Sequence, residues 1–186
     1  MQHREMRALI VYETMYGSTR TIAEHIALGL ADRFDATLVP VAEATKDLAT
    51  DADLVVCGAP THIHGLSRPR TRRMAVDGAQ RDPSLEVAPG ADGPGVREWI
   101  GSLGHVDGLI AAAFDTRIDG PAFMTGRAGM AIARQLRRHG CTLAVAPGSF
   151  LVDKQNHLLA DQPARAKSWG ATLAVAAVMS PTHPHP

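Results

Sequence analysis

Apolar and polar positions change their period several times along the chain. Leu9, Ile10 and Val11 form a continuous apolar run, which predicts a strand buried on both faces of a parallel sheet. From residue 21 onward apolar side chains recur at every fourth position, so they share one face of a helix. The members of this face are Ile22, Ile26, Leu30 and Phe34. Strand and helix patterns keep alternating after this point, which predicts βαβ units and a parallel sheet.

Five strands and four helices follow from these patterns. The strands are expected at 7–12, 37–41, 53–59, 108–114 and about 142–146, and the last of them resumes at 150–152. Pro40 shortens the second strand and places it at an edge of the sheet. The helices are expected at 18–33, 95–103, 126–139 and 163–179. Right-handed crossovers then give an α/β fold, a three-layer doubly wound sandwich around a five-stranded parallel sheet.

A turn rich in hydroxyl groups joins the first strand to the first helix. Its residues are Thr14, Met15, Tyr16, Gly17, Ser18 and Thr19. The first N–H groups of a helix have no intrahelical partner and carry partial positive charge, so this turn is expected to hold one phosphate group. The chain has neither the G-x-x-x-x-G-K-[ST] loop for a triphosphate nor the G-x-G-x-x-G loop for a dinucleotide at this place. A turn whose hydroxyls only cap the helix is the alternative.

The T-x-x-G-x-T pattern of this turn resembles the T/S-x-T-G-x-T loop of the flavodoxin-like family, which wraps the phosphate of FMN. Thr14, Gly17 and Thr19 match the pattern, whereas Tyr16 replaces its middle threonine and removes one hydroxyl contact. The Met-Tyr-Gly version is similar to the quinone-reductase branch and to small bacterial flavodoxin-domain proteins. The resemblance implies FMN as the cofactor and a strand order of 2-1-3-4-5.

With that order, ligands bind beyond the carboxyl ends of the strands where the order reverses. Two further segments reach this edge, and both resemble flavin loops of the family. After the third strand, CGAPTHIHGLSRP supplies Pro60, Thr61, His62, Ile63, His64 and Gly65. After the fourth strand, AFDTRIDGPAF supplies Phe114, Asp115, Thr116 and Arg117.

Several of these side chains suit the chemistry of a flavin. Arg117 is the candidate for stabilising negative charge near N1 and C2=O of the ring, and Asp115 either orients that arginine or clamps the loop. An ordinary surface ion pair of the two is the alternative. His62 and His64 are candidates for packing at the flavin edge and for proton donation, or they are loop residues without a role. Two histidines alone are too few for a metal site, so no metal is expected.

The segment 65–93 is rich in Arg, Pro, Asp and Gly and has no hydrophobic periodicity, so it is expected to be a long loop insertion, either a lid or disordered. Its arginines, Arg68, Arg70, Arg72 and Arg73, either receive the phosphate of NADPH or an acidic partner, or form a solvated arm. In the last helix Trp169, Leu173 and Ala177 form one apolar stripe, and the apolar character of its other faces makes a homodimer contact plausible. A single domain over 1–180 is expected, with a disordered tail at 181–186.

Composition narrows the classes of function. The 186 residues carry 19 basic and 19 acidic side chains, so no overall field attracts nucleic acid or an anionic membrane. No stretch has the pattern of a signal peptide or a membrane span, which predicts a cytoplasmic protein. Cys57 and Cys141 both lie in apolar runs and are expected to be small core residues.

The sequence therefore predicts an FMN-binding, flavodoxin-like redox protein. Its electrons pass either between protein partners or from NAD(P)H to a quinone-like acceptor, and no residue is assigned a catalytic role. The competing interpretation is a non-enzymatic module of the same fold, with weak or no flavin occupancy. The substituted turn, the lack of a Trp/Tyr pair to sandwich the ring and the arginine-rich insertion all favour that alternative.

Overall fold

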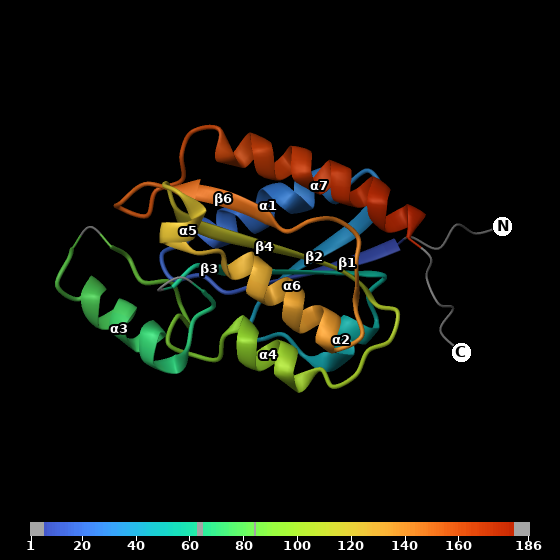
Figure 1. The fold of residues 1–186 in the computed structure, drawn as a ribbon, viewed down its shortest axis with the longest axis horizontal. Coiled ribbons are helices and arrows are strands. Elements are labelled where there is room, and N and C mark those ends of the chain that lie inside the picture. The colour runs from blue at the N-terminus through green and yellow to red at the C-terminus, as the bar shows by residue number, and fades with distance from the viewer. Residues whose placement is uncertain (1–5, 63–64, 84, 181–186) are drawn as a thin grey trace.

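A parallel sheet forms the middle layer of the computed structural model, which describes residues 6–62, 65–83 and 85–180 (Figure 1). The strands run in the order β2-β1-β3-β4-β5. Strand β6 also pairs with β4, along the second half of that strand. Their bounds are β1 (Met6–Tyr12), β2 (Phe34–Pro40), β3 (Leu54–Pro60), β4 (Ile110–Ile118), β5 (Thr142–Leu143) and β6 (Gly148–Val152). The predicted parallel sheet, its strand order and the edge position of β2 are confirmed.

The fifth strand is split into two pieces that pair with different halves of β4. Thr142 and Leu143 lie opposite the start of β4, whereas β6 lies opposite Phe114–Ile118. Pro147, which has no N–H to give to a ladder, directly precedes β6. Because β6 extends the pairing, β4 continues four residues past the predicted end at Phe114. The polar residues directly after Phe114 therefore lie in a strand and not in a loop.

Helices cover both faces of the sheet. On one face lie α1 (Ser18–Leu30) and α7 (Gln162–Met179), as the upper layer of Figure 1 shows. The helices of the other layer and of the sheet edge are α2 (Lys46–Thr50), α3 (Pro69–Ala79), α4 (Val96–Ser102), α5 (Ala122–Thr125) and α6 (Ala128–Arg138). Within the described ranges, no helix combines the length and the apolar character needed to cross a bilayer.

Alternate residues of the central strands enter two separate cores. Leu9 and Val11 of β1 pack towards α4 and α6, whereas Ile10 packs towards α1 and α7. Cys57 and Cys141 are buried free thiols in the first of these cores, as predicted, and burial raises the pKa of both. The continuous apolar runs of the sequence thus correspond to strands covered on both faces.

Helices α1 and α7 touch backbone to backbone through two glycines. A Cβ atom built on Gly29 would lie 2.2 Å from the carbonyl oxygen of Lys167, and one built on Gly170 would lie 2.5 Å from that of Ile26. Leu173 is fully buried between these layers. The predicted stripe of α7 is therefore an internal packing face. The homodimer contact expected at the other faces of this helix, where Val175 and Val178 are exposed, stays a prediction.

The insertion at 65–93 is not a structureless loop, because α3 occupies its first half. Pro69 stands in the first turn of the helix, and the Thr71 hydroxyl accepts a hydrogen bond from the N–H of Arg68 (2.9 Å). The side chain that this helix buries most completely is Arg72, which is 2% exposed. Hydrophobic periodicity missed the helix because a charged side chain, and not an apolar one, anchors it to the rest of the protein.

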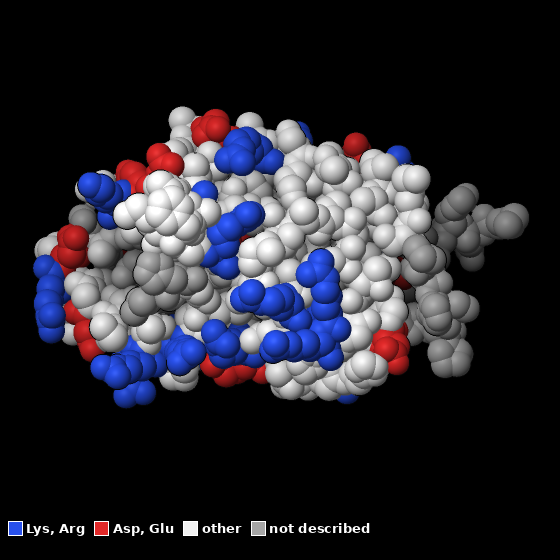
Figure 2. Space-filling view, in the orientation of Figure 1, with Lys and Arg blue, Asp and Glu red and all other residues white. Residues whose placement is uncertain are grey.

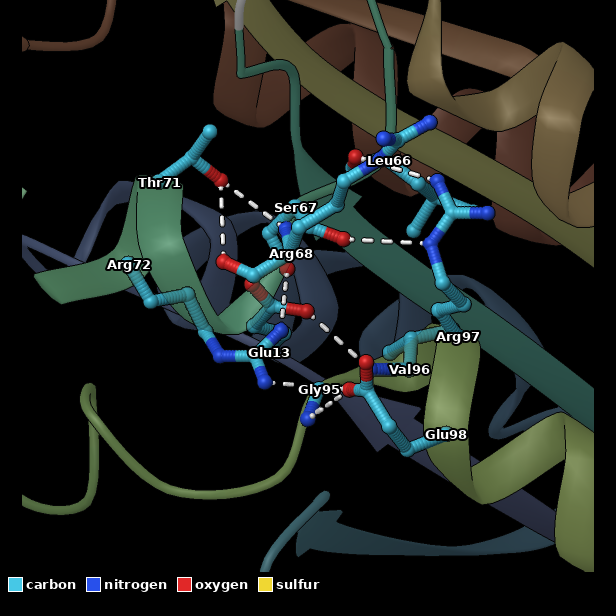
Figure 3. A network of polar contacts seen from close by, with 10 residues as sticks. All are labelled: Glu13, Leu66, Ser67, Arg68, Thr71, Arg72, Gly95, Val96, Arg97 and Glu98. Atoms are coloured by element: carbon cyan, nitrogen blue, oxygen red, sulfur yellow. Dashed lines mark hydrogen bonds and ion pairs between the residues drawn. The ribbon is translucent and has the colours of Figure 1, made fainter.

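Arg72 reaches two partners from different parts of the chain (Figure 3). One guanidinium nitrogen donates to the hydroxyl of Ser67 (2.8 Å), and the other forms an ion pair with Glu98 of α4 (3.1 Å). Glu98 also accepts a hydrogen bond from the N–H of Gly95 (2.7 Å). The expectation that Arg72 binds an external phosphate or stays solvated is therefore wrong for this residue.

Glu13, at the end of β1, completes this buried polar network. Its Oε2 accepts a hydrogen bond from the N–H of Val96 (3.0 Å) (Figure 3). Burial raises the pKa of the Glu13 carboxyl, while hydrogen bonds from Ser67 and Val96 and the charge of Arg72 act in the opposite direction. A Cβ atom on Gly95 would lie 2.4 Å from a nitrogen of Arg72 and 2.7 Å from Oε2 of Glu13. The network thus fastens the insertion to β1 and α4, and its side chains close in on Gly95.

Candidate functional site

The carboxyl ends of β1, β3 and β4 meet around a small cavity of about 80 Å³. Most of the residues that line it belong to the three loops singled out in the sequence. They are Thr14, Met15, Tyr16, Ser18, Thr19, Pro60, Thr61, Thr116 and Arg117. The structure therefore brings the predicted phosphate turn together with both predicted ring loops. Ile118, Val152 and Asn156 complete the lining, and the sequence analysis did not include them.

The N-terminus of α1 has the features of an anion site. Gly17, the residue before the helix, has a φ of 90°, which a glycine adopts without strain, and its N–H donates to the Thr14 hydroxyl (3.1 Å). The helix has no side-chain cap and no acidic residue in its first turn. In the described ranges no acceptor is found for the N–H groups of Ser18, Thr19 and Arg20, and the first intrahelical bond is that of Thr21 to Gly17 (3.1 Å). These donors suit one phosphate group.

The hydroxyls of the turn are less free than its N–H groups. Ser18 donates its only hydroxyl proton to the carbonyl oxygen of Asn156 (2.6 Å). The hydroxyls of Thr19 and Thr116 are buried and hydrogen-bonded to each other (2.8 Å). The Ser18 hydroxyl is therefore not available to donate to a phosphate in this arrangement. Backbone N–H groups are the main donors of the turn.

At the end of β4 the predicted residues divide between core and site. Phe114 is fully buried and packs edge-on against Phe150, with ring centroids 6.3 Å apart, so its side chain cannot frame a ligand. A Cβ atom on Gly58 would lie 1.9 Å from the Phe114 ring, which shows how closely β3 and β4 pack here. The prediction that the Phe114 side chain belongs to the site is therefore wrong, because this side chain lies in the core.

Asp115 is also fully buried, and it positions neighbouring groups. Its carboxylate accepts hydrogen bonds from the N–H of Gly129 (2.7 Å) and from the hydroxyl of Ser149 (2.6 Å). Burial raises the pKa of Asp115, against the effect of these hydrogen bonds and of Arg127 and Arg117. The alternative of a surface ion pair with Arg117 is wrong, because Asp115 has no exposed surface.

Arg117 is linked to Asp115 through Ser149 and is held against the next loop. Its Nε donates to the Ser149 hydroxyl (3.0 Å). One terminal nitrogen donates to the carbonyl oxygen of Gly120 (2.7 Å) and to the hydroxyl of Thr125 (3.0 Å). The arrangement fits both predicted roles of Asp115, which orients the arginine through a hydroxyl and ties the strand to the start of α6. Arg117 contributes a fixed positive charge to the cavity wall.

The loop after β3 turns sharply at His62. The N–H and C=O groups of His62 are hydrogen-bonded to those of Gly65 (2.7 and 2.9 Å), and Thr61 accepts a bond from the N–H of Ala128 at the start of α6 (3.0 Å). Ile63 and His64, which were predicted to contact the ring, lie outside the described residues. Among the residues that are described, no three His, Cys, Asp or Glu side chains come together to hold a metal ion.

The His62 ring is neutral at physiological pH. Burial, with a further contribution from the charge of Arg72, lowers its pKa from 6.5 to about 4. The expectation that this histidine gains and loses a proton near neutrality is therefore wrong. An uncharged imidazole can pack at a ligand edge or form a hydrogen bond, but it does not supply a proton from an imidazolium ion at pH 7.

Replacing His62 by glutamine is expected to reduce the loss of stability in mild acid. Between pH 6.5 and 5 the unfolded chain protonates His62 and the folded protein does not, so this group lowers the free energy of unfolding as the pH falls. The size of the effect is about 1.5 kcal/mol over this interval. Urea unfolding of both proteins at pH 6.5 and pH 5 measures it. Equal losses in both proteins would contradict the assignment.

A larger cavity, of about 420 Å³, opens on the other flank of the turn, between the ends of β1 and β2. Thr14 and Tyr16 line both cavities. The insertion forms one wall: the Ala88 N–H donates to the Met15 carbonyl oxygen (2.8 Å), and the Tyr16 hydroxyl donates to the carbonyl oxygen of Ala75 (3.0 Å). Sequence reasoning missed this cavity, because neither 86–90 in the insertion nor 40–43 on the opposite side matches a binding motif.

Comparisons with known proteins agree with this arrangement. Residues 9–70 match the family model of the flavodoxin domain. A search of curated protein sequences finds no match. Among solved structures, a flavodoxin from the domain Archaea is 18% identical, with a TM-score of 0.62 over 93% of this chain and 99% of that chain. The WrbA-like flavodoxin of Agrobacterium tumefaciens is 18% identical, with a TM-score of 0.60 over 95% and 100%. The Streptococcus pneumonia TIGR4 flavodoxin is 17% identical, with a TM-score of 0.62 over 90% and 97%. The protein is therefore flavodoxin-like, in its fold over nearly the whole chain and in its sequence over residues 9–70.

Proposed function

We propose that the protein binds FMN and transfers electrons. The observation that carries this proposal is the uncapped N-terminus of α1, where Ser18 and Thr19 have N–H groups without an acceptor in the described structure and line the cavity at the ends of β1, β3 and β4. The fold supports it, since similar structures include flavodoxins described in an oxidised state and in a two-electron reduced state. The residues fit the group: the small cavity matches a phosphate in size, and an arginine stands at its wall.

The chain's own residues have distinct parts in this proposal. The first turn of α1 holds the phosphate through backbone N–H groups, and Gly17 leaves the approach open because no atom lies within 4 Å of the place where its Cβ would be. Arg117 supplies a positive charge that Asp115 fixes through Ser149. The bound flavin would supply the one- and two-electron chemistry. The protein thus contributes binding, orientation and electrostatics.

We propose two alternative routes for the electrons. Protein partners exchange electrons at an exposed flavin edge, or NAD(P)H reduces the protein and a quinone-like acceptor oxidises it. Within the described residues, Tyr16 is the aromatic side chain that lines the 80 Å³ cavity, and no Trp/Tyr pair encloses the cavity. A flavin bound there would have one exposed face, which favours a small acceptor. Steady NAD(P)H oxidation in the presence of a quinone supports the enzymatic form.

One observation favours a module that does not hold flavin. The hydroxyls of Ser18 and Thr19 are already bonded within the chain, and the cavity beside them is too small for a whole flavin. Such a module would bind other molecules through the same fold. It predicts no quenching of flavin fluorescence at micromolar protein and no change in the flavin absorption spectrum.

A titration with FMN and riboflavin separates these functions. FMN binding through the turn predicts quenched flavin fluorescence and an affinity at least about tenfold higher than that of riboflavin, which lacks the phosphate, because each hydrogen bond to a charged group contributes about 1.5–3 kcal/mol. Equal affinities for the two flavins would show that the turn is not the anchor. The absence of binding by either would exclude the redox function.

Substituting Thr14 by alanine is expected to weaken FMN binding about tenfold. The Thr14 hydroxyl accepts the hydrogen bond that shapes the turn at Gly17, and the residue lines the cavity. Thr21→Ala is the matched control, because Thr21 lies in the first turn of the helix that follows and lines neither cavity. Its affinity should stay within about twofold of the wild type. Equal weakening by both substitutions would point to a general loss of the helix N-terminus.

A further inference from the structure

A groove lined by four arginines crosses the face of the molecule that carries α4 and α6. We call it the arginine groove, after Arg68, Arg97, Arg134 and Arg138. Its volume is about 630 Å³, and its other lining residues are His62, Gly65, Leu66, Thr71, Ala131 and Gln135. Figure 2 shows basic side chains gathered on this face, over α6 and beside α3 and α4. The groove is distinct from the cavities at the phosphate turn, because it shares no lining residue with them.

The positive charge of the arginine groove is uncompensated. No acidic side chain lines it, and within the described residues none of its four arginines forms an ion pair. The whole chain carries equal numbers of basic and acidic residues, so this is a local separation of charge and not an excess. Four like charges around one concavity repel one another, and an anion in the groove would relieve that repulsion.

The structure holds part of this groove in place. Arg97 donates from Nε to the carbonyl oxygen of Ser67 and from Nη2 to that of Leu66, both at 3.2 Å (Figure 3). Ser67 is itself bonded to the buried Arg72. Arg134 and Arg138 stand one turn apart on α6, so their side chains leave the same face of the helix. Three elements distant in the sequence thus bring their guanidinium groups to one concavity.

The lining also contains polar groups without partners. Nε2 of His62 and Oε1 of Gln135 are buried side-chain atoms for which the described structure provides no hydrogen bond. Buried polar atoms are nearly always paired in folded proteins. Two residues that line the groove thus have hydrogen-bonding capacity that no described residue uses, and a modest shift of their side chains would turn it towards a ligand.

We propose that the arginine groove binds the phosphate groups of a nucleotide-sized molecule. Guanidinium groups form paired hydrogen bonds with phosphate oxygens, and several of them around one site suit a ligand with more than one phosphate. The volume lies within the range of small-molecule sites, of about 300–1,000 Å³. A concave site suits such a molecule better than the convex surface of an acidic protein. The groove borders the turn at His62 and Gly65, so a role for this ligand as electron donor or acceptor rests on the proposed function, whereas phosphate binding does not.

Calorimetric titration with inorganic pyrophosphate, ADP and NADPH tests the proposal on the full chain. Binding of at least one of these probes is expected at submillimolar concentration. Arg134→Gln and Arg138→Gln should each weaken it about tenfold, and both side chains are exposed, so these variants should fold normally. Arg137→Gln is the control, because it removes the same charge from the same helix at an exposed position outside the groove. Its effect should be less than twofold.

The outcomes separate the sources of the phosphate. Binding of pyrophosphate and ADP alone supports a site for a phosphate ester, and tighter binding of NADPH identifies a dinucleotide. Bound polyanion should also raise the pKa of His62 above about 4, which histidine ring signals in NMR spectra report. No binding of any probe, equal losses in all three variants, or binding of an acidic protein without any phosphate would overturn the proposal. Because the probes bind without flavin, such a failure leaves the FMN titration unaffected.

Discussion

Replacing Arg72 by methionine is expected to lower the free energy of unfolding by about 3 kcal/mol. The guanidinium is 2% exposed and joins Ser67 to Glu98, so its loss leaves the Ser67 hydroxyl and two carboxyl groups without their cation. Glu13, whose ionised form the charge of Arg72 favours, then lies buried beside Glu98 without the cation that offsets their repulsion. The figure is at the low end for a buried pair, because the Glu98 side chain is 37% exposed and can turn towards water.

Urea unfolding of Arg72→Met beside Arg73→Met measures this effect. Arg73 is the exposed neighbour in α3, and its substitution should change stability by less than about 0.5 kcal/mol. Arg72→Lys should lie between the wild type and the methionine variant, since an ammonium group keeps the charge but cannot pair with both partners as the fork does. A loss in Arg72→Met no greater than in Arg73→Met would mean that the network does not hold the insertion.

The substitution Gly29→Val is expected to lower the free energy of unfolding by about 3 kcal/mol. The new Cβ would lie 2.2 Å from the carbonyl oxygen of Lys167 and 2.7 Å from the N–H nitrogen of Ala171, and both are backbone atoms that no change of rotamer can move. The two helices must therefore separate, which opens the packing around Leu173. Thermal unfolding and urea unfolding both report this loss.

Gly101→Val is the matched control for this close approach. Gly101 lies inside α4, and no atom is within 4 Å of the place where its Cβ would be, so the same substitution meets open space. Its stability should change by less than about 0.5 kcal/mol, because valine and glycine differ little in helix propensity. Comparable losses at both positions would attribute the effect to valine in a helix and would contradict a backbone contact between α1 and α7.

The sheet and the turn at 14–19 could be predicted because their signals are local. The apolar run before Tyr12 predicts a doubly covered strand, and the hydroxyl-rich turn with Gly17 predicts a sharp entry into a helix. Pro40 indicates an edge strand, because proline has no backbone N–H to donate to a neighbouring strand. Each of these signals lies within a few neighbouring residues.

The extension of β4 and the helix in the insertion could not be predicted in the same way. Asp115 is as buried as a core leucine, but only because Gly129 and Ser149, both far from it in the sequence, give it hydrogen bonds. Arg72 anchors α3 through Glu98, which is also distant. Polar residues with distant partners look like loop residues to any rule based on periodicity.

The arginines show the same limit of sequence-based reasoning for the prediction of binding sites. The run from Arg68 to Arg73 stands out in the sequence because its charges are adjacent, yet the structure buries Arg72 and leaves Arg68 as the only arginine of that run in the arginine groove. The other arginines of the groove come from α4 and α6, and only the fold brings them together. A cluster of charges along the sequence therefore does not predict where charges cluster on the surface.

The contact between α1 and α7 has a consequence for biosynthesis. Helix α1 emerges from the ribosome before α7, but the surface that covers its Gly29 side belongs to residues 162–179. Until that later stretch has been translated, the helix that begins at the phosphate turn has one apolar flank facing water, where chaperones and proteases can reach it. Folding of this layer is therefore expected to follow translation of α7 and not to accompany the emergence of α1.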